Sequence, residues 1–416
     1  MPTDCSPTLF PFAPVEGRTV VASFDGGAIT SDAGALLLGA TDKVLGLTRK
    51  LAGCFRDNRN QACTEHAVET LLMQRVVGIA LGYEDLNDHD QLRHDPVMAV
   101  LAGKLAASRA DCAPVAGKST LNRLELSKTE PTRYHKIAAD TGAIEALFVD
   151  LFLDAHARAP AQITLDLDAT DDPLHGHQEG RFFHGYYDCY CYLPLYVFCG
   201  RHLLAAKLRP SSRGAAVGAV QEVARIIARI RARWPRVRIL LRGDSGFAIE
   251  ELMVWAEANR VDYVFGLARN ERLAAEIEAE MLRTQAAAQA GGKAARRFRD
   301  FQWSTLDSWS RMRRVIGKAE WRRARPILGL SSRLCRGARS MPGGCMRTST
   351  APAARWKTAS RSANSTCSPT APRRRRCGPT SCGCGSPASP TCCCARCAAS
   401  AWFTRSLPAP PAARSG

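Results

Sequence analysis

ITLDLDAT at residues 163–170 and VRILLRGDSGF at residues 237–247 decide the fold of this 416-residue chain. The first stretch alternates apolar with polar residues and is rich in β-formers, which predicts a strand. The second predicts a buried strand that runs into a glycine-containing turn. Working outward, the pattern predicts further strands at 182–199, 202–209 and 261–270, and helices at 215–233 and 248–259. The order β-β-β-α-β-α-β predicts an α/β domain, with a mixed sheet flanked by helices.

The residues on either side of this core have other patterns. Residues 1–158 predict an α-rich region, whose helices are expected at 63–82, 97–107, 118–127 and 130–157. An earlier helix is expected after the Gly26-Gly27 turn, with Ser31 or Asp32 as its cap. Beyond the core, residues 271–299 predict a helix, and WSTLDSW (303–309) and RRVIGKAEW (313–321) predict two more strands.

Several classes of protein and ligand are disfavoured by the sequence. The seven cysteines of the first 320 residues show no paired zinc spacing, and we find neither a signal peptide nor an apolar run of about 18 residues. We therefore expect a cytoplasmic protein with reduced thiols and no membrane partner. AGKST at 116–120 resembles the end of a phosphate-binding loop, but Cys112 occupies its first glycine position, so no nucleotide is expected.

Two aspartates stand where the predicted strands end. Asp168 lies near the end of the first strand, and Asp244 lies at the end of a later one. Carboxylates at strand ends of a mixed sheet can converge, and such oxygen ligands suit Mg²⁺. Two such ions can activate an attacking oxygen and stabilise a leaving one in phosphodiester transfer. The alternative is that each aspartate is a turn or cap residue.

Neighbouring polar residues offer other candidates. We expect Asp166 to point to the opposite face of its strand from Asp168, and we keep it as the alternative ligand. His175 and His177 are candidate metal ligands, but a contact with substrate near Asp168 or a simple polar turn fits them better. Asp171 and Asp172 are expected to be turn residues.

These motifs together resemble a known family. D-x-T (Asp168, Thr170), HGHQEG (175–180), YLPLYVF (192–198) and RGDSGF (242–247) are similar to motifs of the bacterial insertion-sequence transposases of the DDE type. The opening FDGGAITSDAGALLL and the stretch that begins FRDNRNQACTEH also resemble that group, so the resemblance covers roughly residues 15–320. It implies a ribonuclease-H-like catalytic domain in which Asp168 and Asp244 are the first two members of a catalytic, metal-binding triad. The third member would be a glutamate on a later helix.

The chain has no acidic residue where that glutamate is expected. Glu320 is the last acid, whereas 17 of the 57 Lys and Arg and 10 of the 17 Cys follow it. The segment 321–416 can be a basic DNA-binding arm, a cysteine-rich metal module or a frameshifted translation.

The frameshift is favoured by codons that the sequence forces. When each codon begins one base earlier, Trp356 before Lys357 must become glutamate, and Cys392-Cys393-Cys394 must give two leucines. With permitted codons, 346–370 can become EDVYCARGEMENRIKECQLDLFAD. This string resembles the Y-x-x-R-x-x-x-E segment of the family, with the forced glutamate at its end. Similarly, 324–334 can become KANPRFVVSSL. The shift would lie near Trp321–Arg325.

The sequence therefore predicts three regions: an α-rich DNA-binding region at 1–158, an incomplete ribonuclease-H-like domain at 159–320, and a disordered tail at 321–416. By resemblance, the protein is a DNA transposase that uses Mg²⁺ or Mn²⁺ to cut and join strands at element ends, as a homo-oligomer associated with the bacterial nucleoid. This copy is expected to be defective for lack of the third acid. The alternatives are a metal-dependent nuclease of the same fold and a non-catalytic DNA-binding remnant. The basic clusters Arg225–Arg238 and Arg296–Arg314 are either phosphate-facing surfaces or solvated faces.

Overall fold

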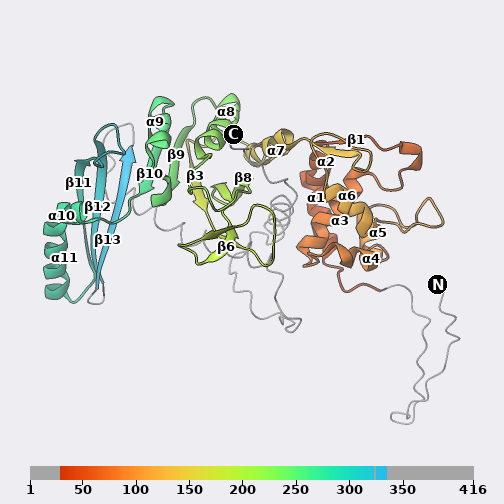
Figure 1. The fold of residues 1–416 in the computed structure, drawn as a ribbon, viewed down its shortest axis with the longest axis horizontal. Coiled ribbons are helices and arrows are strands. Elements are labelled where there is room, and N and C mark those ends of the chain that lie inside the picture. Colours follow the sequence, from red (N-terminus) through yellow and green to blue (C-terminus); the bar gives the residue numbers. More distant parts are fainter. Residues whose placement is uncertain (1–28, 323–324, 335–416) are drawn as a thin grey trace, which may run out of the picture. The chain divides into compact units, whose positions relative to one another are not determined.

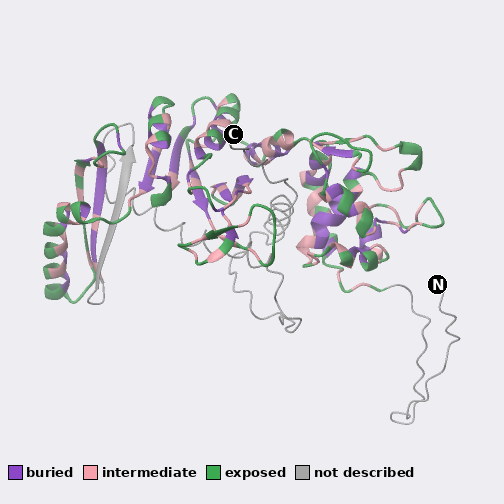
Figure 2. Cartoon of the chain, in the orientation of Figure 1, coloured by how far each residue is buried: buried purple, intermediate pink, exposed green. Residues whose placement is uncertain are grey.

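The computed structural model describes residues 29–322 and 325–334, with side chains described up to Trp321. The chain divides into two compact units between Ala138 and Ala139. Each unit has its own buried core, which Figure 2 shows along the inner sides of the helices and strands. None of the helices in the described ranges is long and apolar enough to cross a membrane.

The first unit is mainly helical (Figure 1). Its elements are α1 (Ala35–Leu45), α2 (Leu47–Ala52), β1 (Phe55–Asp57), η1 (Gln61–Cys63), α3 (Val68–Ala80), η2 (Leu86–Asp88), α4 (His89–Leu92), α5 (Pro96–Leu101), α6 (Lys118–Glu125) and β2 (Ile137–Ala139). Helix α3 lies at its centre and is buried along most of its length. The buried amide of Gln74 on α3 pairs with both backbone groups of Ala116, at 2.7 and 2.9 Å, so its polar atoms are satisfied.

The second unit contains the mixed sheet. Its elements up to the last parallel strand are α7 (Thr141–Asp154), β3 (Gln162–Ala169), β4 (Asp172–Pro173), β5 (Phe182–His184), β6 (Cys189–Tyr192), β7 (Leu195–Cys199), β8 (His202–Lys207), α8 (Ala219–Arg233), β9 (Arg238–Gly243), η3 (Ser245–Phe247), α9 (Glu250–Ala258) and β10 (Asp262–Gly266). They are followed by α10 (Glu271–Glu276), α11 (Glu278–Gly291), β11 (Ala295–Trp303), β12 (Arg313–Arg322) and β13 (Arg325–Leu334).

The sheet has eight strands in the order β11-β12-β13-β10-β9-β3-β7-β8. Strands β3, β9 and β10 run parallel, whereas β7, β8 and the β11–β13 group pair antiparallel. Strands β4, β5 and β6 form a separate three-stranded sheet that is inserted between β3 and β7. The predicted mixed sheet is therefore present, with the β4–β6 sheet inserted between two of its strands and the β11–β13 group added at its β10 edge.

Apolar side chains cover one face of the central strands. On β3, Ile163, Leu165 and Leu167 belong to the core, while the residues between them are polar. Helix α8 buries a stripe of Val223, Ile226, Ile227 and Ile230 at helical spacing. Helix α7 packs on β8 and α8, and α8 packs on α9, so these three helices form the layer over this face.

Several predicted boundaries differ from the structure. Helix α7 was predicted within the first region, which ended at 158, but its Val149, Phe152 and Leu153 lie in the core of the second unit. The segment 271–299 was predicted to be helical throughout, but its helices α10 and α11 end at Gly291 and strand β11 begins at Ala295. The predicted strand 303–309 is wrong beyond its first residue, since it forms the connection between β11 and β12. Neither Ser31 nor Asp32 caps α1; its cap is Gly34.

The C-terminal boundary also differs. The disordered tail was predicted from residue 321, but β12 continues to Arg322 and β13 pairs with both β12 and β10. This strand occupies the segment for which the shifted frame gives KANPRFVVSSL. The predicted tail from residue 335 onward lies outside the described residues.

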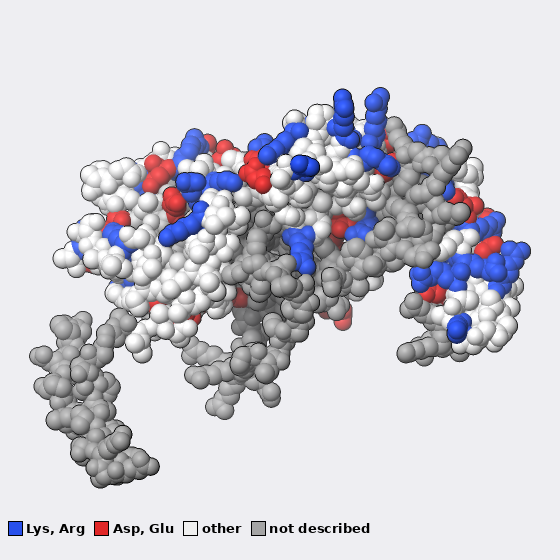
Figure 3. Space-filling view, turned by 180° about the vertical axis from the view of Figure 1, so that it is seen from behind, with Lys and Arg blue, Asp and Glu red and all other residues white. Residues whose placement is uncertain are grey.

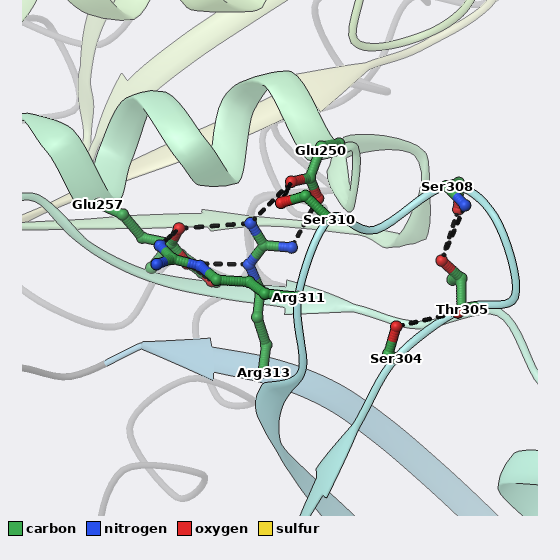
Figure 4. A network of polar contacts seen from close by, with 9 residues as sticks. Glu250, Glu257, Ser304, Thr305, Ser308, Ser310, Arg311 and Arg313 are labelled. Atoms are coloured by element: carbon green, nitrogen blue, oxygen red, sulfur yellow. Dashed lines mark hydrogen bonds and ion pairs between the residues drawn. The ribbon is translucent and has the colours of Figure 1, made fainter.

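A buried polar network joins the β11–β13 group to the parallel strands (Figure 4). Arg313 on β12 donates to Glu257, at 2.9 Å, and to Glu250, at 2.6 Å, both on α9. Tyr263 on β10 donates to the same Glu257, at 2.8 Å. Burial opposes ionisation of Glu257, but its partners Arg313, Arg311 and Tyr263 lower its pKa on balance. Arg313 also lowers the pKa of Glu250 to about 2.

Replacing Arg313 tests whether this network fixes the β11–β13 group. Arg313→Met leaves the buried Glu257 with fewer donors, so we expect the free energy of unfolding in urea to fall by about 3 kcal/mol. Arg314→Met is the matched control, because Arg314 forms a more exposed pair with Asp300 and should change stability by less than about 1 kcal/mol. Equal effects of the two substitutions would contradict this account.

Candidate active site

Asp168 is held at the end of β3. It is the penultimate residue of the strand, and only 9% of it is exposed. The hydroxyl of Thr170, two residues later, donates to its carboxylate at 3.0 Å. The D-x-T spacing therefore has a local purpose, since the threonine fixes the orientation of the carboxylate.

Asp244 occupies a tightly held turn after β9. Its carboxylate accepts from the backbone amide of Gly246 at 2.8 Å, and the buried ring of Phe247 anchors the turn in the core. The turn lies against the end of β10, where a Cβ on Gly266 would come within 3.2 Å of the Asp244 carbonyl carbon. Glycine at 266 thus permits this close approach. The Asp244 side chain itself is exposed.

The register of β3 and β9 relates the two aspartates. Asp166 and Arg242 are Cα partners in this parallel pair. Asp168 and Asp244 each follow their member of the pair by two residues, and Asp244 keeps an extended backbone. Because side chains alternate with period two, both aspartates leave neighbouring strands at the same end and toward the same face. Adjacent strands are about 4.8 Å apart.

The expectation for the face of Asp166 was wrong. Residues two apart on a strand share a face, and Asp166 and Asp168 both lie on the side opposite the apolar row of Leu165 and Leu167. Asp166 instead forms a two-pronged ion pair with Arg242, with Nη2 donating to Oδ2 at 2.7 Å. Arg242 thus occupies both oxygens of Asp166, which disfavours it as a metal ligand.

Sequence reasoning missed Tyr187, which lies among the acidic residues of this region. Burial, together with nearby Asp171, Tyr186, Asp244 and Asp168, raises its pKa to about 12. Asp168 and Asp244 therefore both contribute to the raised pKa of the same hydroxyl. The Tyr187 ring is partly buried against the core. The signal was the GYYD turn at 185–188, whose aromatic residues have no obvious structural need in a tight turn.

The other candidates form no cation site with these residues. His175 and His177 are exposed in the turn after β4, and the carbonyl of His175 accepts from Gln178. Asp172 lies on β4, opposite Tyr192, rather than in a turn. Within residues 29–322 and 325–334, no three His, Cys, Asp or Glu side chains are grouped so that they could hold a metal ion.

Most arginines of the two basic clusters are paired with acids. Arg225, Arg229 and Arg233 of α8 pair with Glu222, Asp150 and Asp154, and Arg296, Arg299 and Arg314 pair with Glu320, Glu276 and Asp300. Figure 3 shows basic side chains beside acidic ones over the face drawn there. The structure therefore favours solvated, ion-paired surfaces over phosphate-facing ones for these clusters.

The central strands have the order β8-β7-β3-β9-β10. Neighbours among β8, β7 and β3 pair antiparallel, whereas β9 and β10 run parallel to β3. This arrangement is the ribonuclease-H-like fold. The sequence comparison agrees with this class: residues 12–326 match the family model described as Transposase DDE domain group 1, and the chain belongs to that family. No curated protein matches the sequence. The family acts on DNA, and the recognition made from the sequence motifs is confirmed.

Substitutions in the ion pair of Arg242 with Asp166 test whether this pair stabilises the polar face of the sheet. Arg242→Ala leaves a carboxylate that is only 13% exposed without its partner, so we expect the free energy of unfolding to fall by about 3 kcal/mol. Asp166→Leu combined with Arg242→Met should recover most of that loss, because it removes both charges. Urea unfolding of the single and double variants measures this. A loss below about 1 kcal/mol for Arg242→Ala would mean that solvent screens the pair.

Proposed function

We propose that this chain is built to cut and join DNA strands at the ends of an insertion sequence, with Asp168 and Asp244 as two metal-binding carboxylates. The observation that carries the proposal is the parallel pairing of β3 and β9, whose register brings the two aspartates to one end and one face of the sheet. Carboxylate oxygens are the ligands that Mg²⁺ and Mn²⁺ accept. When bound, such ions supply positive charge to the attacking and leaving oxygens of a phosphodiester.

The residues of the chain itself have simpler roles in this proposal. Asp168 and Asp244 hold the cation, Thr170 orients Asp168, and the amide of Gly246 orients Asp244. The Arg242–Asp166 pair keeps the neighbouring carboxylate occupied, so that it does not compete for the ion. Tyr187 brings a neutral hydroxyl to the region of the two aspartates, since its pKa is raised to about 12.

A second candidate function is a non-catalytic DNA-binding remnant, and the lack of a third acid favours it for this copy. The last acid, Glu320, is 4% exposed and pairs with Arg296 and Lys318, so it is not offered to a metal. Glu250 and Glu257 are held by Arg313. The family match ends at residue 326, next to the shift inferred near Trp321–Arg325. Two carboxylates alone bind a cation weakly.

Restoring the reading frame tests both candidates. A chain re-encoded in the neighbouring frame from about residue 322 should cleave a supercoiled plasmid that carries its element ends, in the presence of Mg²⁺ or Mn²⁺. The chain as it stands should bind this plasmid without appreciable cleavage. In the restored chain, Asp168→Ala or Asp244→Ala should abolish cleavage, whereas Asp307→Ala, in the exposed connection between β11 and β12, should retain it.

Robust cleavage by the unaltered chain that is lost on Asp244→Ala would show that another residue supplies the third ligand. Cleavage by the restored chain that survives both Asp168→Ala and Asp244→Ala would overturn the assignment of the site.

A further inference from the structure

Exposed aromatic side chains gather in one small hairpin. Strands β5 and β6, with the turn between them, carry four of the five exposed aromatic residues in the described part of the chain: Phe182, Phe183, Tyr186 and Tyr190. Tyr186, at the turn, is 85% exposed, and the other three are about half exposed. The fifth, Tyr134, lies in the first unit. Such a concentration of exposed rings indicates a binding surface rather than chance exposure.

The rings of the hairpin are held in a defined arrangement. Phe183 and Tyr190 are cross-strand partners on one face, with ring centroids 5.4 Å apart in a T-shaped contact. The guanidinium of Arg181 lies over the Tyr190 ring, 4.5 Å from its centroid. Aromatic faces flanked by a guanidinium form a platform on which flat, electron-rich rings can stack.

Several contacts connect this hairpin to the proposed active site. The hydroxyl of Ser211 donates to the Phe182 carbonyl at 3.0 Å, and Pro210 bridges to Tyr192. A few residues further along the same loop, Ala215 approaches the Asp244 turn. A Cβ added to Gly246 of that turn would lie 3.0 Å from the Ala215 Cβ. Tyr187, in the turn of the hairpin, lies near Asp168 and Asp244. The platform and the two aspartates therefore border one continuous region.

The connecting loop also brings positive charge. Arg209 is buried and donates to the carbonyls of Leu193 and Val217, while its Nη2 has no hydrogen-bond partner among the described residues. Arg213, four residues later, is exposed. The exposed guanidinium of Arg213 suits a phosphate group, whereas the buried Arg209 holds the loop that carries it.

We propose that the hairpin 181–192 is a stacking platform for unpaired DNA bases beside Asp168 and Asp244, and that Arg213 contacts the phosphates of the same strand. The proposal deepens the proposed function, on which it rests for the identity of the strand. Aromatic rings recognise the faces of bases, whereas the Arg213 guanidinium recognises the backbone, so a single-stranded segment satisfies both.

The test separates base stacking from the attraction of phosphates to the basic C-terminal segment. Fluorescence anisotropy in EDTA would compare the affinity of the full chain for a labelled oligothymidylate with its affinity for a strand of the same length that has abasic sugars. Both strands carry the same phosphates, so their charge attraction to the 17 Lys and Arg beyond residue 320 is alike. We expect the oligothymidylate to bind roughly tenfold more tightly.

Tyr190→Ala and Phe183→Ala should each remove most of this preference and leave binding of the abasic strand unchanged. Tyr190→Phe and the control Tyr134→Ala should keep it. Tyr186→Ala, which removes a ring that is almost wholly in solvent, should also reduce it without any effect on folding, as circular dichroism would verify.

The proposal is overturned if the unaltered chain shows no preference for bases, or if the preference survives in Tyr190→Ala and Tyr186→Ala. It is also overturned if these variants instead abolish self-association in sedimentation, because the rings would then bind a second copy. The base preference is measured without cleavage, so the two proposals can fail separately. If a frame-restored chain keeps the base preference but does not cleave DNA, the result contradicts the proposed reaction and leaves the stacking platform supported.

Discussion

The parallel pairing of β3 with β9 is the constraint on which the rest of the second unit depends. It fixes Asp166 opposite Arg242. Because side chains alternate with period two, this pair determines which face of the sheet each neighbouring side chain of β3 and β9 occupies. One face is apolar and lies under α7, α8 and α9. The other face carries Asp166, Asp168 and Arg242, and a shift of one residue in register would send these charges into the core.

The β4–β6 sheet and the β11–β13 group are attached to this arrangement by polar contacts as well as by apolar packing. The β4–β6 sheet follows directly after Asp168 and returns to the core through Leu193 and Ser211. The β11–β13 group is joined through Arg313, whose guanidinium bridges two glutamates of α9. Gly317 of β12 lets Ile277 approach closely, since a Cβ there would lie 2.5 Å from the Ile277 methyl. Specific side chains thus help to place both groups, in addition to the backbone pairing of β13 with β10.

The sequence predicted the strands β3, β9 and β10, the helices between them and the strand-end positions of the two aspartates, because each of these has a strong local pattern. The β4–β6 sheet was missed because its strands are two to four residues long, and the single strand predicted at 182–199 covered β5, β6 and β7. Strand β11 was missed because ARRFRDFQW is polar on its exposed side and follows an Ala-rich helix. Helix α7 showed its helical pattern clearly, but nothing local could reveal which core its Phe152 enters.

The error at Asp166 has a different origin. The rule of period two was sufficient to place Asp166 and Asp168 on one face, and it was applied incorrectly. What the sequence could not reveal was that Arg242, 76 residues away, would neutralise Asp166. Long-range pairs of this kind depend on strand register, which local patterns do not determine.

Binding of Mn²⁺ to the unaltered chain, followed by electron paramagnetic resonance, tests most directly whether Asp168 and Asp244 share one site. The account predicts weak binding that either Asp168→Asn or Asp244→Asn removes, with no further loss in the double variant, while Asp307→Asn leaves it unchanged. Independent, additive losses from the two substitutions, or binding that neither of them affects, would contradict it.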